Sequence, residues 1–450
     1  MKKLFALIIA IIMSVVFVAC QGSGDPNKGG NANDYVAGTP GLKYMVNTDK
    51  VSATFIGVGT ATDSEITIAS HYKDVPVTKI KRAALYENET VVKVNIPKQV
   101  KSIGPSAFMQ ATKLETISIP SNTELEEIGA YCFKNCTALK NLDIPITVKF
   151  FGEDAVEGCP NFVLNSYKGG DYLGSKSNPY IILMKASSSD VTSLTVSKDC
   201  RIIYANAFYN CEKLETITFE SDTNLTAIGN NAFSGCISLK ELTIPSSVEK
   251  IGASAFGAQR DFITAINNGC ESLKTVTFKE NNKLVSLGEH AFDLCTTLES
   301  VINFEHTKLT EVKAYTFFDC SNLKSIKLPK TTQVLDKWVF ARCNSLKPND
   351  VFNYEGSLNK MEQGVFRENG AYDNVVVPKT VTYIGDLCFS QGNRNKIIYL
   401  LNPDISTLHV NWNVAGAKVN NVYPRLTYYV FSASSVEGGW HYVNGVPQAW

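Results

Sequence analysis

The apolar residues of this chain recur at a fixed spacing. The stretch from Ile228 to Pro245, IGNNAFSGCISLKELTIP, contains two apolar clusters separated by polar residues, and near-copies of it follow one another along most of the chain. Periods of about 20–30 residues predict a repeat solenoid. We call the phenylalanine of each "AF" pair, or the residue in its place, the ladder residue; these are Leu85, Phe108, Phe133, Val156, Phe208, Phe233, Phe256, Phe292, Phe317, Phe340, Phe366 and Phe389.

Each repeat predicts two short strands. Segments of the form LxxIxI, such as LETISIP from Leu114 and LKELTIP from Leu239, alternate apolar and polar residues, which is typical of a half-buried strand. Their closing proline has no N–H to donate and ends the strand. An apolar residue also stands five positions before every ladder residue. The pattern V/LxxIGxxAF therefore predicts a second strand and a tight turn on the opposite side of the repeat, where the glycine would supply permissive backbone geometry.

A single repeat cannot fold alone, because its few inward apolar side chains do not offset the backbone entropy of its residues. Stacking is therefore obligatory, and the array is the unit of stability.

The pattern LxxIxIPxxVxxIGxxAFxxCxxL resembles the BspA-like leucine-rich repeats, over about residues 75–400. The stretches GTPGLKYMVNTDK before the array and WHYVNGVPQAW at the end also resemble that family. The resemblance implies a leucine-rich-repeat superhelix, a repeat solenoid rich in β-structure with short strands and turns or short helices in each repeat. It also implies a cell-surface protein that acts in adhesion.

The N-terminus has the layout of a secretory leader. Lys2 and Lys3 precede an apolar run from Leu4 to Ala19, which is shorter than the roughly 20 residues that span a bilayer. The sequence FVAC ending at Cys20 resembles a lipobox, with phenylalanine in place of the usual leucine. We therefore expect a signal peptide at 1–19, lipidation of Cys20 and a membrane-anchored lipoprotein at the cell surface, in the outer membrane if the cell is Gram-negative. A plain secreted protein is the alternative.

The remaining boundaries follow from composition and pattern. Residues 20–40 are rich in glycine and asparagine and predict a flexible tether. Residues 41–79 predict a capping hairpin, 80–400 the solenoid of about 12 repeats, and 401–450 a C-terminal cap. The glycine-rich GSGDPNKGG of the tether lacks the GK[ST] of a phosphate loop.

Three irregular stretches are candidates for contacts. An insert at 160–200 contains the strand candidates PYIILMKA and SLTV and a loop, GGDYLGSKSNPY, which is a candidate contact site if exposed and otherwise a packing element. A second insertion lies at 257–267. The C-terminal aromatic residues are expected to cover the last repeat, or else to form a carbohydrate platform; they are Tyr428, Tyr429, Phe431, Trp440, Tyr442 and Trp450.

The chain has 12 cysteines, most of them three positions after a ladder residue. In a secreted protein this number would ordinarily indicate disulfides. Equivalent positions in stacked repeats are about 4.8 Å apart, but parallel side chains make poor disulfide geometry. We therefore expect a row of small buried thiols.

Composition and motifs argue against several function classes. Lys plus Arg and Asp plus Glu are both 43, so no basic field favours nucleic acid. The five histidines fall in unrelated contexts, and HExxH, GxSxG, Walker and calcium-loop motifs are all missing. We expect no catalytic residues, no metal site, no cofactor and no enzymatic activity.

What remains for function is the surface of the strands. The intervening positions of LxxIxI should point outward and form a flat lattice of mostly short polar groups. We expect this concave strand face to bind an extracellular protein ligand or a glycan; a glycan-binding lipoprotein, a structural spacer and an inert solubilising face are the alternatives. The predicted site residues are Thr116, Ser118, Asn141, Asp143, Thr216, Thr218, Glu241, Thr243, Thr275, Thr277, Ser325 and Lys327.

Overall fold

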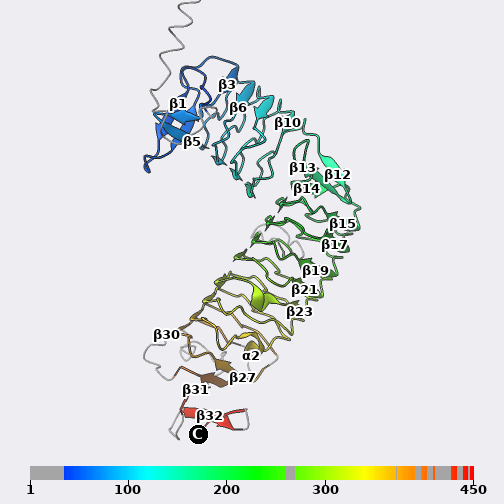
Figure 1. Ribbon diagram of the computed structural model, residues 1–450. Coiled ribbons are helices and arrows are strands. Elements are labelled where there is room, and N and C mark those ends of the chain that lie inside the picture. The colour runs from blue at the N-terminus through cyan, green and yellow to red at the C-terminus, as the bar shows by residue number, and fades with distance from the viewer. Residues whose placement is uncertain are drawn as a thin grey trace, which may run out of the picture. The chain divides into compact units, whose positions relative to one another are not determined.

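The computed structural model describes residues 35–258, 269–370, 372–390, 397–402, 409–410, 427–432, 439–443 and 446–449. The chain forms two compact units (Figure 1). One comprises residues 1–164 and 173–181, the other 165–172 and 182–450. The predicted signal peptide, Cys20, most of the predicted tether and most of the insertion at 257–267 lie outside the described residues.

The first unit is built from two sheets of short strands. One has the order β1-β2-β5-β7-β9-β11, with β4 beside β5, and the other the order β10-β8-β6-β3. β1 and β2 form an antiparallel hairpin, β4 pairs antiparallel with β5, and the remaining pairs are parallel. The strands are β1 (Lys43–Val46), β2 (Ala53–Gly57), β3 (Glu65–Thr67), β4 (His71–Tyr72), β5 (Val75–Ile80), β6 (Lys93–Asn95), β7 (Ser102–Ile103), β8 (Thr116–Ser118), β9 (Glu127–Ile128), β10 (Asn141–Leu142) and β11 (Phe150–Phe151).

The second unit repeats this construction, with sheets β12-β13-β14-β16-β18-β20-β22, β15-β17-β19-β21-β23, β24-β25-β26-β28-β30 and β27-β29-β31-β32-β33. Its strands are β12 (Asn165–Tyr167), β13 (Gly170–Leu173), β14 (Ile182–Ala186), β15 (Ser193–Val196), β16 (Ile202–Ile203), β17 (Thr216–Phe219), β18 (Ala227–Ile228), β19 (Glu241–Ile244), β20 (Lys250–Ile251), β21 (Thr275–Phe278), β22 (Ser286–Leu287), β23 (Ser300–Ile302), β24 (Glu311–Val312), β25 (Val334–Leu335), β26 (Lys360–Met361), β27 (Asn374–Val377), β28 (Tyr383–Ile384), β29 (Ile397–Leu400), β30 (His409–Val410), β31 (Thr427–Phe431), β32 (Gly439–Val443) and β33 (Val446–Ala449).

Each repeat thus contributes to two different sheets, as its two apolar clusters predict. We call the LxxIxI segment the strand leg. The turn leg runs from the two-residue strand that ends five positions before the ladder residue to the third residue after it. The predicted repeat solenoid is confirmed. Helix is scarce in the described residues: α2 (Pro348–Val351), which Pro348 begins at its first position, replaces one strand, and a 3₁₀ turn, η2 (Phe304–His306), follows β23.

The turn leg has an unusual backbone. In most repeats the residues two before and two after the ladder residue adopt left-handed φ angles; for Phe208 these are Asn206 at 58° and Asn210 at 56°. The N–H groups of all three residues donate to carbonyls of the next repeat, at 2.9, 2.7 and 2.8 Å. Alternation of left- and right-handed residues points these N–H groups the same way, so the turn leg forms a hydrogen-bonded strip along the stack.

The recurring glycine of IGxxAF has a different role from the predicted one. Gly229 does not adopt a left-handed φ. A Cβ atom built on it would instead lie 2.5 Å from the backbone nitrogen of Ala205 in the preceding repeat. Close approach of two backbones, and not permissive geometry, therefore requires glycine here.

The core of each unit contains a stack of ladder side chains, from Phe108 to Phe133 in the first and from Phe208 to Phe389 in the second. Phe208, Phe233 and Phe256 lie with ring centroids 5.2 Å apart and nearly parallel, and all three are fully buried. The thiols lie beside them: Cys236 Sγ donates to the carbonyl oxygen of Phe208, at 3.2 Å, and Cys136 Sγ to that of Phe108, at 2.9 Å.

The cysteines are buried and unpaired, as expected, and they carry a hydrogen bond that the sequence did not predict. Eleven described cysteines are free and buried. Burial raises the pKa of Cys136 to about 12 and that of Cys159 to about 11. These thiols are thus protonated donors that satisfy ladder carbonyls.

The insert at 160–200 is a packing element. Both strand candidates form, as β14 and β15. β15 is the first strand of its sheet, and β14 follows the antiparallel pair β12–β13 in the other. The expectation of an exposed GGDYLGSKSNPY loop is wrong for its first half, because Gly170–Leu173 forms β13 and Tyr172 is fully buried. Its second half lies outside the strands, and Lys176 and Ser177 there are exposed. At the other end of the unit, Trp440 is also fully buried and donates its indole N–H to the carbonyl oxygen of Leu400, at 3.0 Å.

Candidate functional site: the polar strand face

Five strand legs of the second unit form one parallel sheet with two rows of outward side chains. Figure 1 shows β15, β17, β19, β21 and β23 side by side. Alternation along each strand buries the intervening apolar residues, so that Ile217, Leu242 and Val276 are at most 7% exposed. The first row contains Ser193, Thr216, Glu241, Thr275, Ser300 and Ser325, aligned by strand register. The second contains Thr195, Thr218, Thr243, Thr277 and Ile302.

This polar strand face is shallow and uncharged along most of its length. Thr216, Thr218, Glu241 and Thr243 are exposed, whereas Thr275 is only half-exposed. The hydroxyls of Thr195 and Thr218 are hydrogen-bonded to each other, at 3.0 Å. Register places side chains of neighbouring repeats about 4.8 Å apart along each row.

The first unit has a shorter version of the same face. Thr116 is paired with Lys93 and Asn141, and Ser118 with Asn95. A polar network occupies the beginning of this sheet: Lys93 Nζ lies 2.6 Å from Glu65 Oε1, and Asn95 donates to the same oxygen at 3.2 Å.

That network sets the ionisation of Glu65 at the start of the first unit's face. The hydrogen bond from Lys93 holds the pKa of the Glu65 carboxyl below its usual range. Glu65 is therefore ionised at neutral pH and paired with its lysine, so this end of the face presents a neutral ion pair.

The predicted residues are brought together as two separate groups, one in each unit. Asp143 is exposed next to β10, and only the backbone of Asn141 is described. Lys327 lies over the ring of Tyr354, with Nζ 5.9 Å from its centroid. Sequence reasoning missed Ser193, Thr195, Ser300 and Ile302, which continue the rows; SLTV and LESVINF carried the alternation that could have found them. Whether the face is concave, and whether it binds a ligand, stay predictions.

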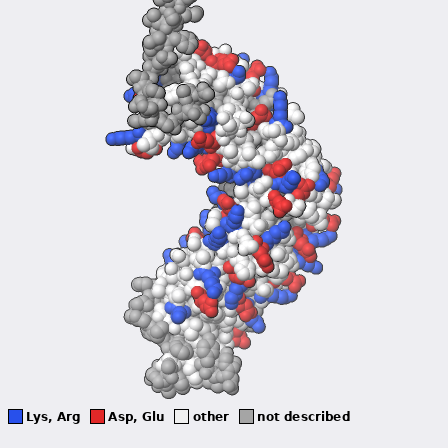
Figure 2. Space-filling model, in the orientation of Figure 1, with Lys and Arg blue, Asp and Glu red and all other residues white. Residues whose placement is uncertain are grey.

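Charged side chains form pairs between repeats. Lys140, Lys240 and Lys324 each bind a glutamate 25 residues earlier, at 2.6–2.9 Å. Figure 2 shows blue and red side chains interspersed over the visible side of the second unit. Such exposed pairs contribute little stability, but they leave no large field of one sign on that side.

The described residues hold no group of three or more histidine, cysteine, aspartate or glutamate side chains placed to bind a metal ion. Within the same part of the chain, no helix has the length and apolarity needed to cross a bilayer. A small hollow of about 180 Å³ lies on the turn legs of the second unit, lined by Phe318, Trp338, Ala341, Arg342, Arg367 and Glu368.

The chain is similar to several solved structures. A leucine-rich repeat protein from Bacteroides ovatus is 23% identical, with 83% of this chain and 98% of that chain covered and a TM-score of 0.39. A leucine rich cell surface protein from Faecalibacterium prausnitzii is 20% identical, covering 85% and 96%, with a TM-score of 0.28. The pneumococcal vaccine antigen PcpA is 18% identical, covering 88% and 87%, with a TM-score of 0.32.

A search of the curated proteins found no match. The sequence profile described as "BspA type Leucine rich repeat region" matches six copies, at residues 63–163, 186–267 and 264–397, which make up more than half of the chain. The chain belongs to the BspA-type leucine-rich repeat family.

Proposed function

We propose that this protein is a non-catalytic, lipid-anchored surface protein that binds a protein ligand through its polar strand face, in adhesion to host or neighbouring-cell proteins. One observation carries the proposal. The second unit repeats short hydroxyl side chains in register on consecutive strands, and Thr195, Thr216, Thr218 and Thr243 are among them. A rigid lattice of donors and acceptors costs little side-chain entropy when it binds an extended chain.

The test compares ligand binding by two matched variants. The chain from Gln21 onward is applied to arrays of extracellular-matrix proteins and of bacterial and host glycans. The variant Thr216→Lys/Thr218→Lys places two long cations on the face, and Thr310→Lys/Thr382→Lys places the same charge on exposed threonines beside β24 and β28 of the turn legs. We expect binding to a matrix protein that only the first variant loses, by at least tenfold.

The other outcomes decide between the alternatives. An equal loss of binding in both variants would show that the added net charge, and not the strand face, causes the loss. Glycan binding that survives the first variant would favour the glycan-binding alternative, although the buried Trp440 is not available to a carbohydrate platform at the C-terminus. Absence of any ligand would favour a structural spacer.

The anchor is tested separately in the native host. Metabolic labelling with an alkyne fatty acid should label the wild-type protein, and Cys20→Ser should abolish the label and release the protein into the medium. Cys20→Ser protein that stays labelled and membrane-bound would overturn the lipidation of Cys20.

A further inference from the structure

A side-chain-sized pocket lies on the turn leg of the second unit, away from the strand face. It arises from the row of residues that directly follow the ladder residues. In three consecutive repeats these are Phe318, Ala341 and Arg367, so a methyl group stands between two long side chains. The gap left above Ala341, which is itself buried, is the hollow of about 180 Å³.

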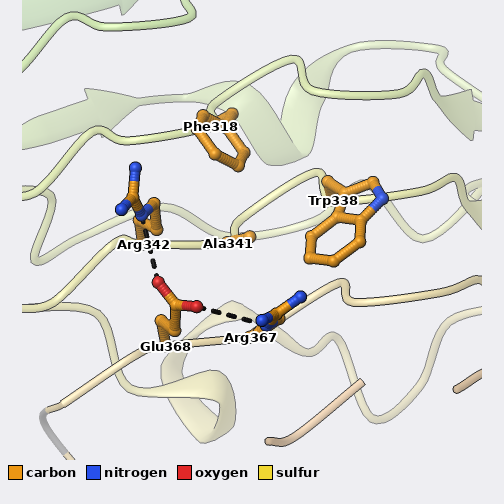
Figure 3. A pocket seen from close by; sticks show the side chains of 6 residues that line it. All are labelled: Phe318, Trp338, Ala341, Arg342, Arg367 and Glu368. Atoms are coloured by element: carbon orange, nitrogen blue, oxygen red, sulfur yellow. Dashed lines mark hydrogen bonds and ion pairs between the residues drawn. The ribbon is translucent and has the colours of Figure 1, made fainter. Parts of the chain in front are cut away.

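The two ends of the hollow are closed by neighbouring rows. Figure 3 shows Trp338 on one side of Ala341 and Arg342 with Glu368 on the other. Trp338 extends over Gly364 of the next repeat, where a Cβ atom would lie 2.6 Å from its ring. Packing on Gly364 thus holds the indole of Trp338 in place as one wall of the hollow.

One carboxylate holds both guanidinium groups in place. Glu368 accepts from Nε of Arg342, at 3.1 Å, and its other oxygen lies 3.2 Å from Nε of Arg367. Arg342 Nη1 also donates to Asp319, at 3.3 Å. Both oxygens of Glu368 are therefore occupied, while further N–H groups of Arg342 and Arg367 have no partner among the described residues.

Each guanidinium also covers an aromatic face. Arg342 lies 5.9 Å from the centroid of Phe318, and Arg367 lies 5.1 Å from that of Trp338. The other face of the indole is stacked with Tyr315, at 6.4 Å. The faces of Trp338 are thus both used, so the pocket does not offer an aromatic face on which a sugar ring could stack.

We propose that this pocket binds the carboxylate of an aspartate or glutamate side chain from a partner polypeptide. The spare guanidinium N–H groups match a planar carboxylate, and the ring edges of Phe318 and Trp338 carry the positive part of the aromatic quadrupole. The methyl of Ala341 and the hydrocarbon walls accommodate the methylene stem. The site lies on the turn leg, so it is independent of the strand face and of the function proposed for it.

The experiment follows the indole N–H resonances of the chain from Gln21 onward, labelled with ¹⁵N-tryptophan. The sequence has four tryptophans, and Trp338→Phe assigns the relevant signal. The titrants are the blocked peptide acetyl-Gly-Glu-Gly-amide, its glutamine isostere and glucuronate. We expect the glutamate peptide alone to shift the Trp338 signal saturably, with a Kd on the order of millimolar, as is usual for one small group.

Three variants test the walls one at a time. Arg367→Gln and Arg342→Gln should each weaken binding of the glutamate peptide about tenfold. Ala341→Leu should abolish it by filling the hollow while leaving both guanidinium groups present. Lys324→Gln removes an exposed, ion-paired cation from a strand leg and should change nothing. Thermal unfolding checks that each variant folds. If Ala341→Leu does not fold, the two arginine variants still decide the test.

The proposal fails if the Trp338 signal stays fixed up to tens of millimolar peptide, or if the glutamine peptide shifts it equally. Tighter binding of glucuronate than of the glutamate peptide would replace it with an acidic-sugar site. Binding that survives Ala341→Leu would place the peptide outside the hollow and also overturn it.

Discussion

The two legs of each repeat differ in how tightly the fold constrains them. The strand leg has ordinary extended geometry and exposes every second side chain, so that threonine, serine, glutamate and even Ile302 occupy equivalent positions. The turn leg packs stacked rings, buried thiols and left-handed residues into a short segment. Folding specificity is therefore concentrated in the turn leg, and the outward side chains of the strand leg are left free to vary.

Alkaline pH should have the largest effect on stability, and it should act through the turn legs, because most described cysteines lie on them. Burial raises the thiol pKa of Cys136 to about 12 and of Cys159 to about 11, above the ordinary value of 9.0. A raised folded pKa means that the stability is fully present below about pH 9 and is lost as pH rises toward the folded values. Each such thiol costs about 1.4 kcal/mol per pH unit in that window.

We therefore expect the free energy of unfolding to fall by several kcal/mol between pH 9 and about 11, measured by urea titration with reductant present. Cys136→Ala/Cys159→Ala should be less stable at pH 7 but show a shallower fall for the first unit. An identical pH slope in that variant would mean that other groups, such as tyrosines, cause the loss.

The next largest effect should come from the ring stack. Phe233 lies between Phe208 and Phe256 with 5.2 Å between centroids on both sides, so Phe233→Ala removes two ring contacts and leaves a cavity. We expect a loss of about 3–5 kcal/mol in unfolding free energy. Ile302→Ala, at a strand-face position that is 44% exposed, is the control and should cost less than about 0.5 kcal/mol. Equal losses would show that the two legs are equally constrained.

A smaller effect should follow from Gly229→Ala, whose new Cβ would lie 2.5 Å from the nitrogen of Ala205. Forcing the repeats apart should cost about 1–3 kcal/mol, measured by denaturant unfolding. Lys313 occupies the equivalent position in a later repeat, so that repeat spacing already accommodates a Cβ. Lys313→Ala should therefore be nearly neutral, and a neutral Gly229→Ala would show that the stack widens freely.

The sequence predicts the fold well because the apolar periods decide it. Alternation in LxxIxI was enough to predict the outward rows, and the residue five before each ladder position predicted the second sheet. The left-handed pair could not be predicted, because the residues that adopt it share no type; they include Asn206, Trp338 and Leu387. Their conformation is imposed by hydrogen bonds to the next repeat, which override local preference.

The site was predicted less completely than the fold. The predicted rows omitted Ser193 and Thr195, because the insert interrupts the repeat period before them. The strand that contains these residues nevertheless joins the same sheet. The pocket above Ala341 depends on comparing one position across three repeats, and its chemistry emerges only when Arg342 and Arg367 are placed in space. Alignment of the repeats would have revealed the gap, but not the shared carboxylate.

The smallest effect, and the one that isolates backbone strain, comes from Ala83 and its neighbour. Ala83 is exposed with a φ of 55°, and Ala84 is not among the left-handed residues. Ala83→Gly should raise the unfolding free energy by about 0.5–1 kcal/mol, because the relief of about 1–2 kcal/mol of left-handed strain exceeds the added entropy of the unfolded chain. Ala84→Gly relieves nothing and should lower it by about 0.4–1 kcal/mol. Urea titration of the two variants therefore has to give opposite signs. Equal signs would show that the strip's hydrogen bonds make the left-handed conformation free of strain, and the turn leg would then be set apart from the strand leg by packing alone.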